Sequence, residues 1–320
     1  MHLGIDISKK TIDCAVRLAD GKFKHKKVSN DAAGFRAVSQ WLKQLADVAP
    51  HVCMEATGVY FESCAEYFAD EGYVVSVVNP VCIKRYGEAK FMRTKTDKAD
   101  AKLIAMYCHE QSPAAWQAPA PAERVLRAYV MRLESLLSMK TQESNRLDVA
   151  REAVQSGIQE HLDWLEAEIK KLRKLIRDHI DNDPDLKNRK ELLDTIPGVG
   201  EGTIATLLSY SMHHDRFDNV RKVVAFAGLD PRIRQSGTSV SDKPMISRFG
   251  HSHLRKLLYM PAIVALHKTE WGTQFRRRLE ASGKRGKLII CAMMRKLIHV
   301  TFGVLKSGKP FDPSLHGATA

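Results

Sequence analysis

The sequence predicts an α/β domain at the amino terminus, a helical middle segment and a mostly α-helical carboxy-terminal domain. Strand-like and helix-like patterns alternate over about the first hundred residues. A stretch rich in proline and alanine, residues 113–121, then interrupts these patterns, and leucines and isoleucines at heptad spacing follow it. We therefore predict three domains, with the boundaries 1–118, 119–187 and 188–320.

Five strands and three helices are predicted in the first domain. The strands are alternating or continuous apolar runs at residues 3–7, 11–18, 23–28, 51–55 and 73–78. The helices begin after the capping residue Asn30 or Asp31, near Gly58 and near Asp97, because apolar residues recur at helical spacing beyond these points. The order is three hairpin-connected strands, helix, strand, helix, strand, helix.

This order matches the ribonuclease-H-like topology, a mixed sheet with helices on its faces. In that topology the first and fourth strands are neighbours, and the helix that begins around Asp97 packs across their ends. The actin-like ATPase fold opens in a similar way, but it usually contains a second similar domain with a glycine-rich phosphate loop. The sequence contains no second copy of this pattern.

The middle segment carries two series of apolar residues at a spacing that alternates between four and three. Their members are Leu126, Val130, Leu133 and Leu137, and then Ile158, Leu162, Leu165, Ile169, Leu172 and Ile176. Such series predict a helical hairpin or a short coiled coil. The segment is either an association module, such as a dimer arm, or an intramolecular hairpin.

The 320-residue chain has an excess of basic residues, 50 Lys and Arg against 37 Asp and Glu, which gives a net charge of +13. This excess favours polyanionic partners such as nucleic acid. The six cysteines form no CxxC pair, as expected for reduced thiols of an intracellular protein. We expect no signal peptide, no apolar run near the roughly 20 residues that span a bilayer, and a cytosolic location.

Four acidic residues are the candidate catalytic and metal-binding residues of the first domain. Asp6 lies between Ile5 and Ile7 in an apolar strand, where an unpaired carboxylate is costly. Glu55 ends the fourth strand, and Asp97 and Asp100 share one face of a helix start. The four candidates are therefore Asp6, Glu55, Asp97 and Asp100. Oxygen ligands of this kind select Mg²⁺ or Mn²⁺, which can activate a nucleophile and stabilise a leaving oxygen.

Each acid also has a simpler interpretation, since an Asp-x-x-Asp pair at a helix start often serves as a cap and interacts with the helix dipole. The combination on one topology favours catalysis. Basic residues crowd the same stretch and suit an anionic substrate, and these are Lys90, Arg93, Lys95, Lys98 and Lys102.

Two further segments are candidates for contact with nucleic acid. Gly198 and Gly200 lie in a Pro-Gly-Val-Gly turn between two predicted helices, which is typical of a helix-hairpin-helix motif that binds phosphate through backbone N–H groups. A plain helical turn would also need these glycines.

Downstream, arginines and serines alternate in a short segment that could present a nucleophile to a phosphate, with Arg232, Arg234, Ser236, Ser239 and Ser241 as its members. A segment rich in serine and glycine is also typical of an ordinary loop. His251, His253 and His267 lack a ligand geometry and are interpreted as structural or surface residues.

With these residues in view, the sequence resembles the DEDD transposases of bacterial insertion sequences, which are described as bridge-RNA-guided recombinases. The resemblance covers essentially the whole chain. Five motifs carry it, Gly4-Ile-Asp6-Ile-Ser-Lys, Met54-Glu55-Ala-Thr-Gly58, Lys95-Thr-Asp97-Lys-Ala-Asp100-Ala, Ile196-Pro-Gly-Val-Gly200 and Phe226-Ala-Gly-Leu-Asp-Pro231.

The resemblance implies that the first domain is RuvC-like and that Asp6, Glu55, Asp97 and Asp100 bind Mg²⁺, with Mn²⁺ as a possible substitute. It also implies that a serine of the carboxy-terminal transposase domain attacks DNA and holds it covalently. Ser236 matches that position, and Ser239 and Ser241 remain alternatives.

The resemblance further implies a guide (bridge) non-coding RNA, donor and target DNA, a homo-oligomer and a bacterial, nucleoid-associated location. The sequence is therefore expected to be an RNA-guided DNA recombinase or transposase of an insertion sequence. A RuvC-like junction nuclease without a covalent intermediate and a non-catalytic architectural protein are the alternatives. The sequence names neither the target DNA nor the guide RNA.

Overall fold

The computed structural model describes most of the chain, and its separate ranges are 1–45, 48–56, 58–92, 95–213, 216–232, 235–236, 240–241, 245–247 and 249–315. The chain divides into two compact units, Met1–Ala118 and Pro119–Ala320. Both the predicted middle segment and the predicted last domain therefore belong to the second unit.

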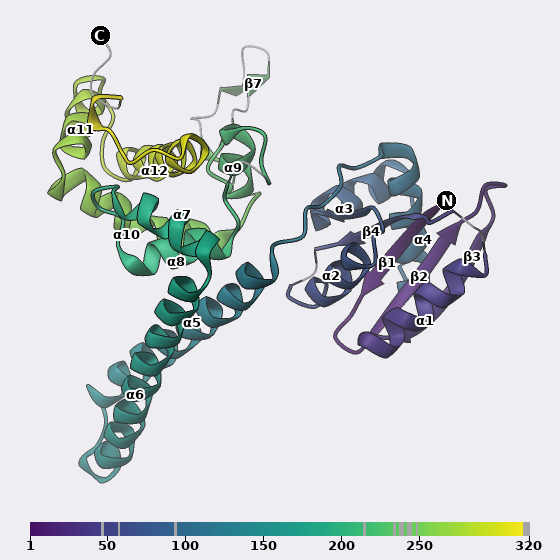
Figure 1. Cartoon of the computed structure of the whole chain (residues 1–320), viewed down its shortest axis with the longest axis horizontal. Helices are drawn as coiled ribbons and strands as arrows, with labels where there is room; N and C mark the ends of the chain where they lie inside the picture. Colours follow the sequence, from purple (N-terminus) through teal and green to yellow (C-terminus); the bar gives the residue numbers. More distant parts are fainter. Residues whose placement is uncertain are drawn as a thin grey trace. The chain divides into compact units, whose positions relative to one another are not determined.

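The first unit is built on a five-stranded mixed sheet with the order β3-β2-β1-β4-β5 (Figure 1). Its strands are β1 (His2–Ile7), β2 (Thr11–Arg17), β3 (Phe23–Ser29), β4 (His51–Glu55) and β5 (Val75–Val78). The first three strands are antiparallel, whereas β4 runs parallel to β1 and to β5. The expected adjacency of the first and fourth strands is confirmed.

Helices cover both faces of this sheet because its side chains are apolar on both. Helices α1 (Ala32–Lys43) and α2 (Glu62–Asp70) pack on the face that carries Leu3 and Ile5. Helices α3 (Pro80–Ala89) and α4 (Asp97–Gln111) pack on the face of Cys53. The side chain of Asp31 accepts a hydrogen bond from the Gly34 N–H and caps α1, one of the two caps that the sequence allowed.

Two elements of the first unit differ from the expectation. Helix α2 begins at Glu62 rather than near Gly58, and α3 occupies a stretch for which no helix was predicted. Only Ile83 and Gly87 of α3 are buried, so its apolar periodicity is weak. Its start is well defined, because Asn79 caps the helix and Pro80 occupies the first turn.

The second unit begins with a long helical hairpin made of α5 (Pro121–Leu147) and α6 (Glu152–Asn182), which lie side by side (Figure 1). Most of the predicted apolar series of α6 is buried within the chain, at Leu162, Leu165, Ile169, Leu172 and Ile176. On α5 the buried apolar positions are Leu126, Val130 and Leu136, while the predicted Leu137 is 38% exposed.

The rest of the second unit is a helical assembly around one core that also includes residues of the hairpin. Its helices are α7 (Pro184–Asp194), α8 (Glu201–Ser209), α9 (Val220–Phe226), α10 (Ser252–Lys268), α11 (Glu270–Ala281) and α12 (Lys287–Ser307), and a short 3-10 turn, η1 (Pro313–Leu315), follows them.

Helix α12 corrects one expectation, because it is long and apolar enough to cross a membrane by length and composition. Its side chains Met293, Leu297 and Ile298 are instead buried in the core of the second unit, and α12 packs against α10. A buried core helix accounts for this composition.

Candidate functional site

A row of acidic side chains crosses the sheet of the first unit. Asp6 and Asp13 are directly opposite each other in the β1–β2 pair. Ile5 pairs with Met54 in the parallel β1–β4 ladder, so Glu55 lies beside Asp6 at the next position. Because side chains alternate along a strand, Asp6 shares the face of Gly4, which is the face that α4 covers.

Helix α4 brings Asp97 and Asp100 to the same end of the sheet. The Thr96 side chain accepts a hydrogen bond from the Ala99 N–H at 3.2 Å and fixes the start of the helix. A Cβ atom on Gly4 would lie only 2.2 Å from the backbone oxygen of Ala101. The missing side chain of Gly4 thus allows α4 to approach β1 closely enough to carry its two aspartates over the strand.

The four predicted acids influence one another electrostatically. The pKa of Asp6 is raised to about 6, first by burial and then by the neighbouring charges of Asp100, Asp97 and Glu55 in that order. The pKa of Asp100 is also raised, first by burial, while Lys95 opposes and Asp97 adds to the shift. The fold therefore gathers negative charge at this end of the sheet.

Lys27 partly compensates that charge. Its ammonium group lies 2.8 Å from Asp13 Oδ2 and 3.3 Å from Asp97 Oδ2, and thereby joins β2 to the start of α4. Asp13 is buried and also contacts the His25 ring at 2.8 Å. The sequence reasoning missed Asp13, although it lies between the apolar residues Ile12 and Cys14 in the same manner as Asp6.

The donor set fits a hard divalent cation, since all four predicted ligands offer carboxylate oxygens. Within the described ranges, however, no three His, Cys, Asp or Glu side chains stand close enough together to hold a metal ion. The carboxylates share one region and one electrostatic field, and Asp97 is turned to Lys27 in this arrangement.

The predicted basic residues near this site have different surroundings. Lys95 and Lys98 are exposed on either side of Asp97, whereas Arg93 lies outside the described residues. Lys90 pairs with Glu110, and the Lys102 ammonium lies 4.8 Å from the centre of the Phe23 ring. Lys95, Lys98 and Lys102 are exposed and form no ion pair with a carboxylate among the described residues, so they are open to an anionic substrate.

The Pro-Gly-Val-Gly turn joins α7 to α8 in the second unit. Gly200 is exposed at the start of α8, where backbone N–H groups can meet an anion. Gly198 has a φ of +94°, and a Cβ there would lie 3.2 Å from Ala265 Cα. Gly198 therefore serves the turn and its packing on α10, while Gly200 is the more accessible glycine.

The serine segment contains four two-residue strands. Strand β6 (Pro231–Arg232) pairs with β9 (Met245–Ile246), and β7 (Gln235–Ser236) pairs with β8 (Val240–Ser241). Ser236 pairs with Val240 in this ribbon, and Arg232 is exposed. Arg234 and Ser239 lie outside the described residues.

The three histidines of this region have structural contacts. His251 packs on the Phe226 ring at 4.3 Å between centroids, and His253 meets the Tyr210 hydroxyl at 2.7 Å. His267 Nδ1 lies 2.8 Å from Arg276 Nη1. These contacts agree with the structural interpretation of all three.

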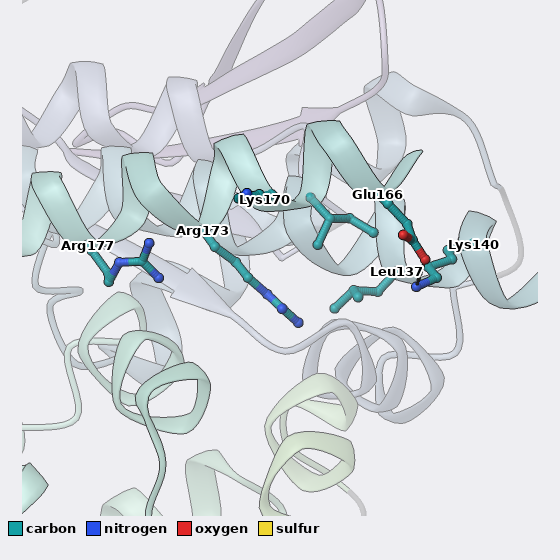
Figure 2. A pocket seen from close by; sticks show the side chains of 7 residues that line it. Leu137, Lys140, Glu166, Lys170, Arg173 and Arg177 are labelled. Atoms are coloured by element: carbon teal, nitrogen blue, oxygen red, sulfur yellow. Dashed lines mark ion pairs between the residues drawn. The ribbon is translucent and has the colours of Figure 1, made fainter. Parts of the chain in front are cut away.

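A positively charged groove of about 400 Å³ lies along the helical hairpin (Figure 2). Leu137 and Ile169 form its apolar part, and its charged lining is Lys140, Glu166, Lys170, Arg173 and Arg177. Lys140 and Glu166 form an ion pair at 2.6 Å across the two helices. The groove adds to the basic surface of the second unit.

The chain is similar to known proteins over most of its length. A transposase family model matches residues 3–150, and a model of the transposase IS116/IS110/IS902 family matches residues 190–277. Pilin gene-inverting proteins of Moraxella bovis and Moraxella lacunata are each 33% identical over 318 residues, 98% of this chain and of theirs. An uncharacterised 43.6 kDa protein of insertion element IS110 from Streptomyces coelicolor is 27% identical over 121 residues, 38% of this chain and 30% of that protein.

Proposed function

Because the chain belongs to the IS110 family of DEDD transposases and recombinases, we propose that it is an RNA-guided DNA recombinase with a metal-binding acidic site and a serine nucleophile. DNA recombination or transposition is the activity of the family. The proposal for the acidic site is supported by the fold, which brings Asp6, Glu55, Asp97 and Asp100 to one end of the sheet, where the last two help to raise the pKa of Asp6.

The strand order and the position of α4 support a ribonuclease-H-like, RuvC-like first unit. In this proposal Asp6, Glu55, Asp97 and Asp100 hold Mg²⁺, which supplies charge neutralisation and polarisation of the scissile phosphate. Without a bound cation, the negative charge of these acids repels anions, and the exposed Lys95 and Lys98 partly offset that charge. Binding of a divalent cation is the expected relief of their mutual repulsion.

The nucleophile in this proposal is Ser236. Its oxygen attacks the phosphorus of a DNA phosphodiester, a serine–phosphate bond forms, and the bond to the 3′ oxygen breaks. The serine proton is lost and the departing 3′ oxygen gains one. Rejoining reverses these steps, with a DNA 3′-hydroxyl attacking the phosphoserine. The backbone of Ser236 belongs to a short antiparallel ribbon, and Arg232 of the same segment is exposed, which supports contact of this segment with a phosphate.

The proposed partners are a guide RNA together with donor and target DNA, acted on by a homo-oligomer. A net charge of +13 and the exposed helix start at Gly200 support contact with phosphate backbones, in the manner of a helix-hairpin-helix motif. Base pairing by the RNA would then choose the sequence. The curated relatives are named for pilin gene inversion, so inversion of a DNA segment is one form that the reaction can take.

A covalent trapping experiment tests the nucleophile. The purified protein is incubated with end-labelled DNA, its co-purified RNA and Mg²⁺, quenched in denaturant and analysed for labelled protein. We expect an adduct with the native protein and none with Ser236→Ala, while Ser241→Ala keeps it. Cut DNA without any adduct would support a metal-dependent junction nuclease instead. Survival of the adduct in Ser236→Ala would move the nucleophile to another residue.

The RNA partner has its own test. The protein is purified without nuclease treatment, and the RNA that accompanies it is sequenced. A defined, structured RNA is expected, and random cellular RNA would contradict guidance by a dedicated molecule.

A further inference from the structure

The segment between α9 and α10 carries Ser236, and the two ends of this segment lie against each other at one narrow point. It follows α9, which ends at Phe226, and precedes α10, which begins at Ser252. We call this point the neck, and it consists of Phe226, Ala227, Gly228, Gly250 and His251. The His251 N–H donates a hydrogen bond to the Phe226 carbonyl at 2.9 Å, which joins the two ends of the segment at the neck.

The neck can close only because two glycines face each other there. A Cβ on Gly250 would lie 2.3 Å from the Gly228 nitrogen and 2.2 Å from the Phe226 oxygen. Gly228 has a φ of +67°, which disfavours any other residue, and a Cβ on it would lie 2.7 Å from the Gly250 nitrogen. The Phe-Ala-Gly-Leu-Asp-Pro motif thus has a structural reason for its glycine.

Arg255, one turn into α10, fastens both sides of the neck with a single nitrogen. Its Nη1 donates to the Ala227 carbonyl at 3.0 Å and to the Gly250 carbonyl at 3.0 Å. A Cβ on Gly228 would meet this nitrogen at 2.5 Å, so the glycine also makes room for the guanidinium group. A charged donor shared by two backbone acceptors makes stronger bonds than a neutral one.

The base of α10 is itself held firmly. His253 contacts the Tyr210 hydroxyl at 2.7 Å through Nδ1, and its Nε2 lies against the Glu134 carboxylate of α5. Tyr210 is 2% exposed, so this anchor is part of the core. Arg255 therefore fastens the neck to a rigid element.

Contacts continue from the neck toward the ribbon. The Ser247 N–H donates to the Asp230 carbonyl at 2.8 Å, and the Ser247 hydroxyl donates to Asp230 Oδ1 at 2.5 Å. Pro231 and Ile246 then pair between β6 and β9. The two sides of the segment are thus paired from the Asp230–Ser247 contacts through the β6–β9 ladder.

From this geometry we propose that Arg255 is a positioning residue, which closes the neck and thereby fixes where the Ser236 segment is presented to DNA. The inference rests on the proposed role of Ser236 as the nucleophile. A nucleophile held within reach and alignment reacts far faster than one on an open loop. Closing the neck also lowers the entropy that the segment loses when it binds DNA.

The test compares Arg255→Gln and Arg255→Lys with Lys268→Gln, which removes an exposed charge at the far end of the same helix. Amide hydrogen exchange is measured over residues 229–247 in the full-length protein, together with DNA affinity, melting temperature and the single-turnover rate of adduct formation. The exchange measurement needs no DNA or metal.

Arg255→Gln is expected to speed exchange over 229–247 and to slow adduct formation about tenfold or more, with DNA affinity changed less than about twofold. Arg255→Lys should fall between it and the native protein, because an ammonium group keeps the charge but not the fixed guanidinium geometry. Lys268→Gln should match the native protein in both readouts.

Unchanged exchange in Arg255→Gln, or faster exchange with a native rate of adduct formation, would overturn the proposal. The proposal would also be wrong if the rate of adduct formation in Arg255→Lys fell only in proportion to the loss of melting temperature. Arg255 would then stabilise the fold without positioning the segment. Absence of an adduct in the native protein, with altered exchange in Arg255→Gln, would count against Ser236 as the nucleophile and leave the closed neck standing as structure alone.

Discussion

Lys27 acts as a resident counter-ion of the acidic site, since its ammonium group bridges Asp13 and Asp97. Replacing it by methionine keeps most of the length of the side chain and removes the charge. We expect Lys27→Met to bind Mg²⁺ about threefold to tenfold more tightly, because the carboxylates lose their internal cation and Asp97 is released. Isothermal titration calorimetry with MgCl₂ measures the affinity directly.

Lys24→Met is the matched control, because Lys24 lies on the same strand with its side chain on the opposite face. Its affinity for Mg²⁺ should stay at the native value. Weaker binding in Lys27→Met would mean that Lys27 orders the acids rather than competing with the cation. If titration of the native protein with MgCl₂ gave no heat of binding, that result would count against the metal site itself.

Gly4 tests whether the approach of α4 to β1 matters for the site. A Cβ at this position would lie 2.2 Å from Ala101 O and 2.3 Å from Ala105 N, both backbone atoms that cannot turn aside. We expect Gly4→Ala to destabilise the first unit by about 1–3 kcal/mol and to weaken Mg²⁺ binding, because α4 must move outward with Asp97 and Asp100. Urea unfolding and calorimetry measure the two effects, and native values in both would contradict the close contact.

At the scale of the element, α6 contains a glycine, Gly157, where neither the backbone conformation nor a neighbouring atom requires the absence of a side chain. Gly157 lies inside the helix, is exposed and has nothing within 4 Å of an added Cβ. Gly157→Ala should stabilise the second unit by about 0.5–1 kcal/mol, because alanine loses less backbone entropy in a helix. Gly272→Ala in α11 should do the opposite, since its Cβ would lie 2.0 Å from Ala265 O. The denaturant midpoint should therefore rise in Gly157→Ala and fall in Gly272→Ala, relative to the native protein.

The elements predicted best were those with strong apolar periodicity. Strands β1, β2, β4 and β5 fall close to their expected ranges because each has several buried side chains, whereas β3 matches its range without a fully buried residue. Helices α3 and α11 were missed because few of their residues are buried, and helices of this kind depend on caps and on neighbours. Helix α6 begins at Glu152, before the first residue of the predicted apolar series, and it includes Gly157 because an exposed glycine is tolerated within a long helix.

The sequence predicted those residues of the candidate site that local patterns identify, and it missed those that depend on contacts between distant segments. Asp6 and Glu55 could be identified because each occurs in or at the end of an apolar strand, and Asp97 and Asp100 because of their spacing at a helix start. Lys27 could not, since its contact with Asp97 depends on the register of β3 against β2 and on the docking of α4. Pairing between distant segments leaves no periodic signal in one sequence.

At the scale of the molecule, the two units have separate cores. The clusters of Leu3, Ile5 and Val52, and of Cys53 and Ile104, draw only on the first unit. The large cluster that runs from Leu126 to Val304 draws only on the second. Their stabilities are therefore expected to respond to different substitutions, so that Gly4→Ala and Gly157→Ala shift different unfolding transitions in calorimetry.

Glu123 at the start of α5 is a buried carboxylate that links several parts of the second unit. Its oxygens accept hydrogen bonds from the Ser211 hydroxyl at 2.6 Å, the Ala120 N–H at 3.0 Å and Arg189 Nη1 at 3.0 Å. The His213 ring adds a contact at 3.2 Å. One side chain thus joins the start of α5 to α7 and to the turn after α8.

Burial alone would raise the pKa of Glu123, but hydrogen bonds from His213, Ser211 and Ala120 outweigh it and lower the pKa to about 2. A carboxyl whose pKa is lower in the folded than in the unfolded state stabilises the fold above the unfolded value. Its contribution, on the order of 3 kcal/mol, is present above pH 4.5, the ordinary value for this group, and is lost as the pH falls toward 2.

Glu123→Gln removes this charge and cannot titrate. We expect it to unfold with a free energy lower by on the order of 3 kcal/mol near pH 7, and the deficit should shrink as the pH falls from 4.5 toward 2. Urea unfolding at a series of pH values measures the difference, with the exposed Glu160→Gln of α6 as the control that changes stability little at any pH. A deficit that stays constant with pH would mean that packing of the side chain, and not its charge, holds α5, α7 and the turn together.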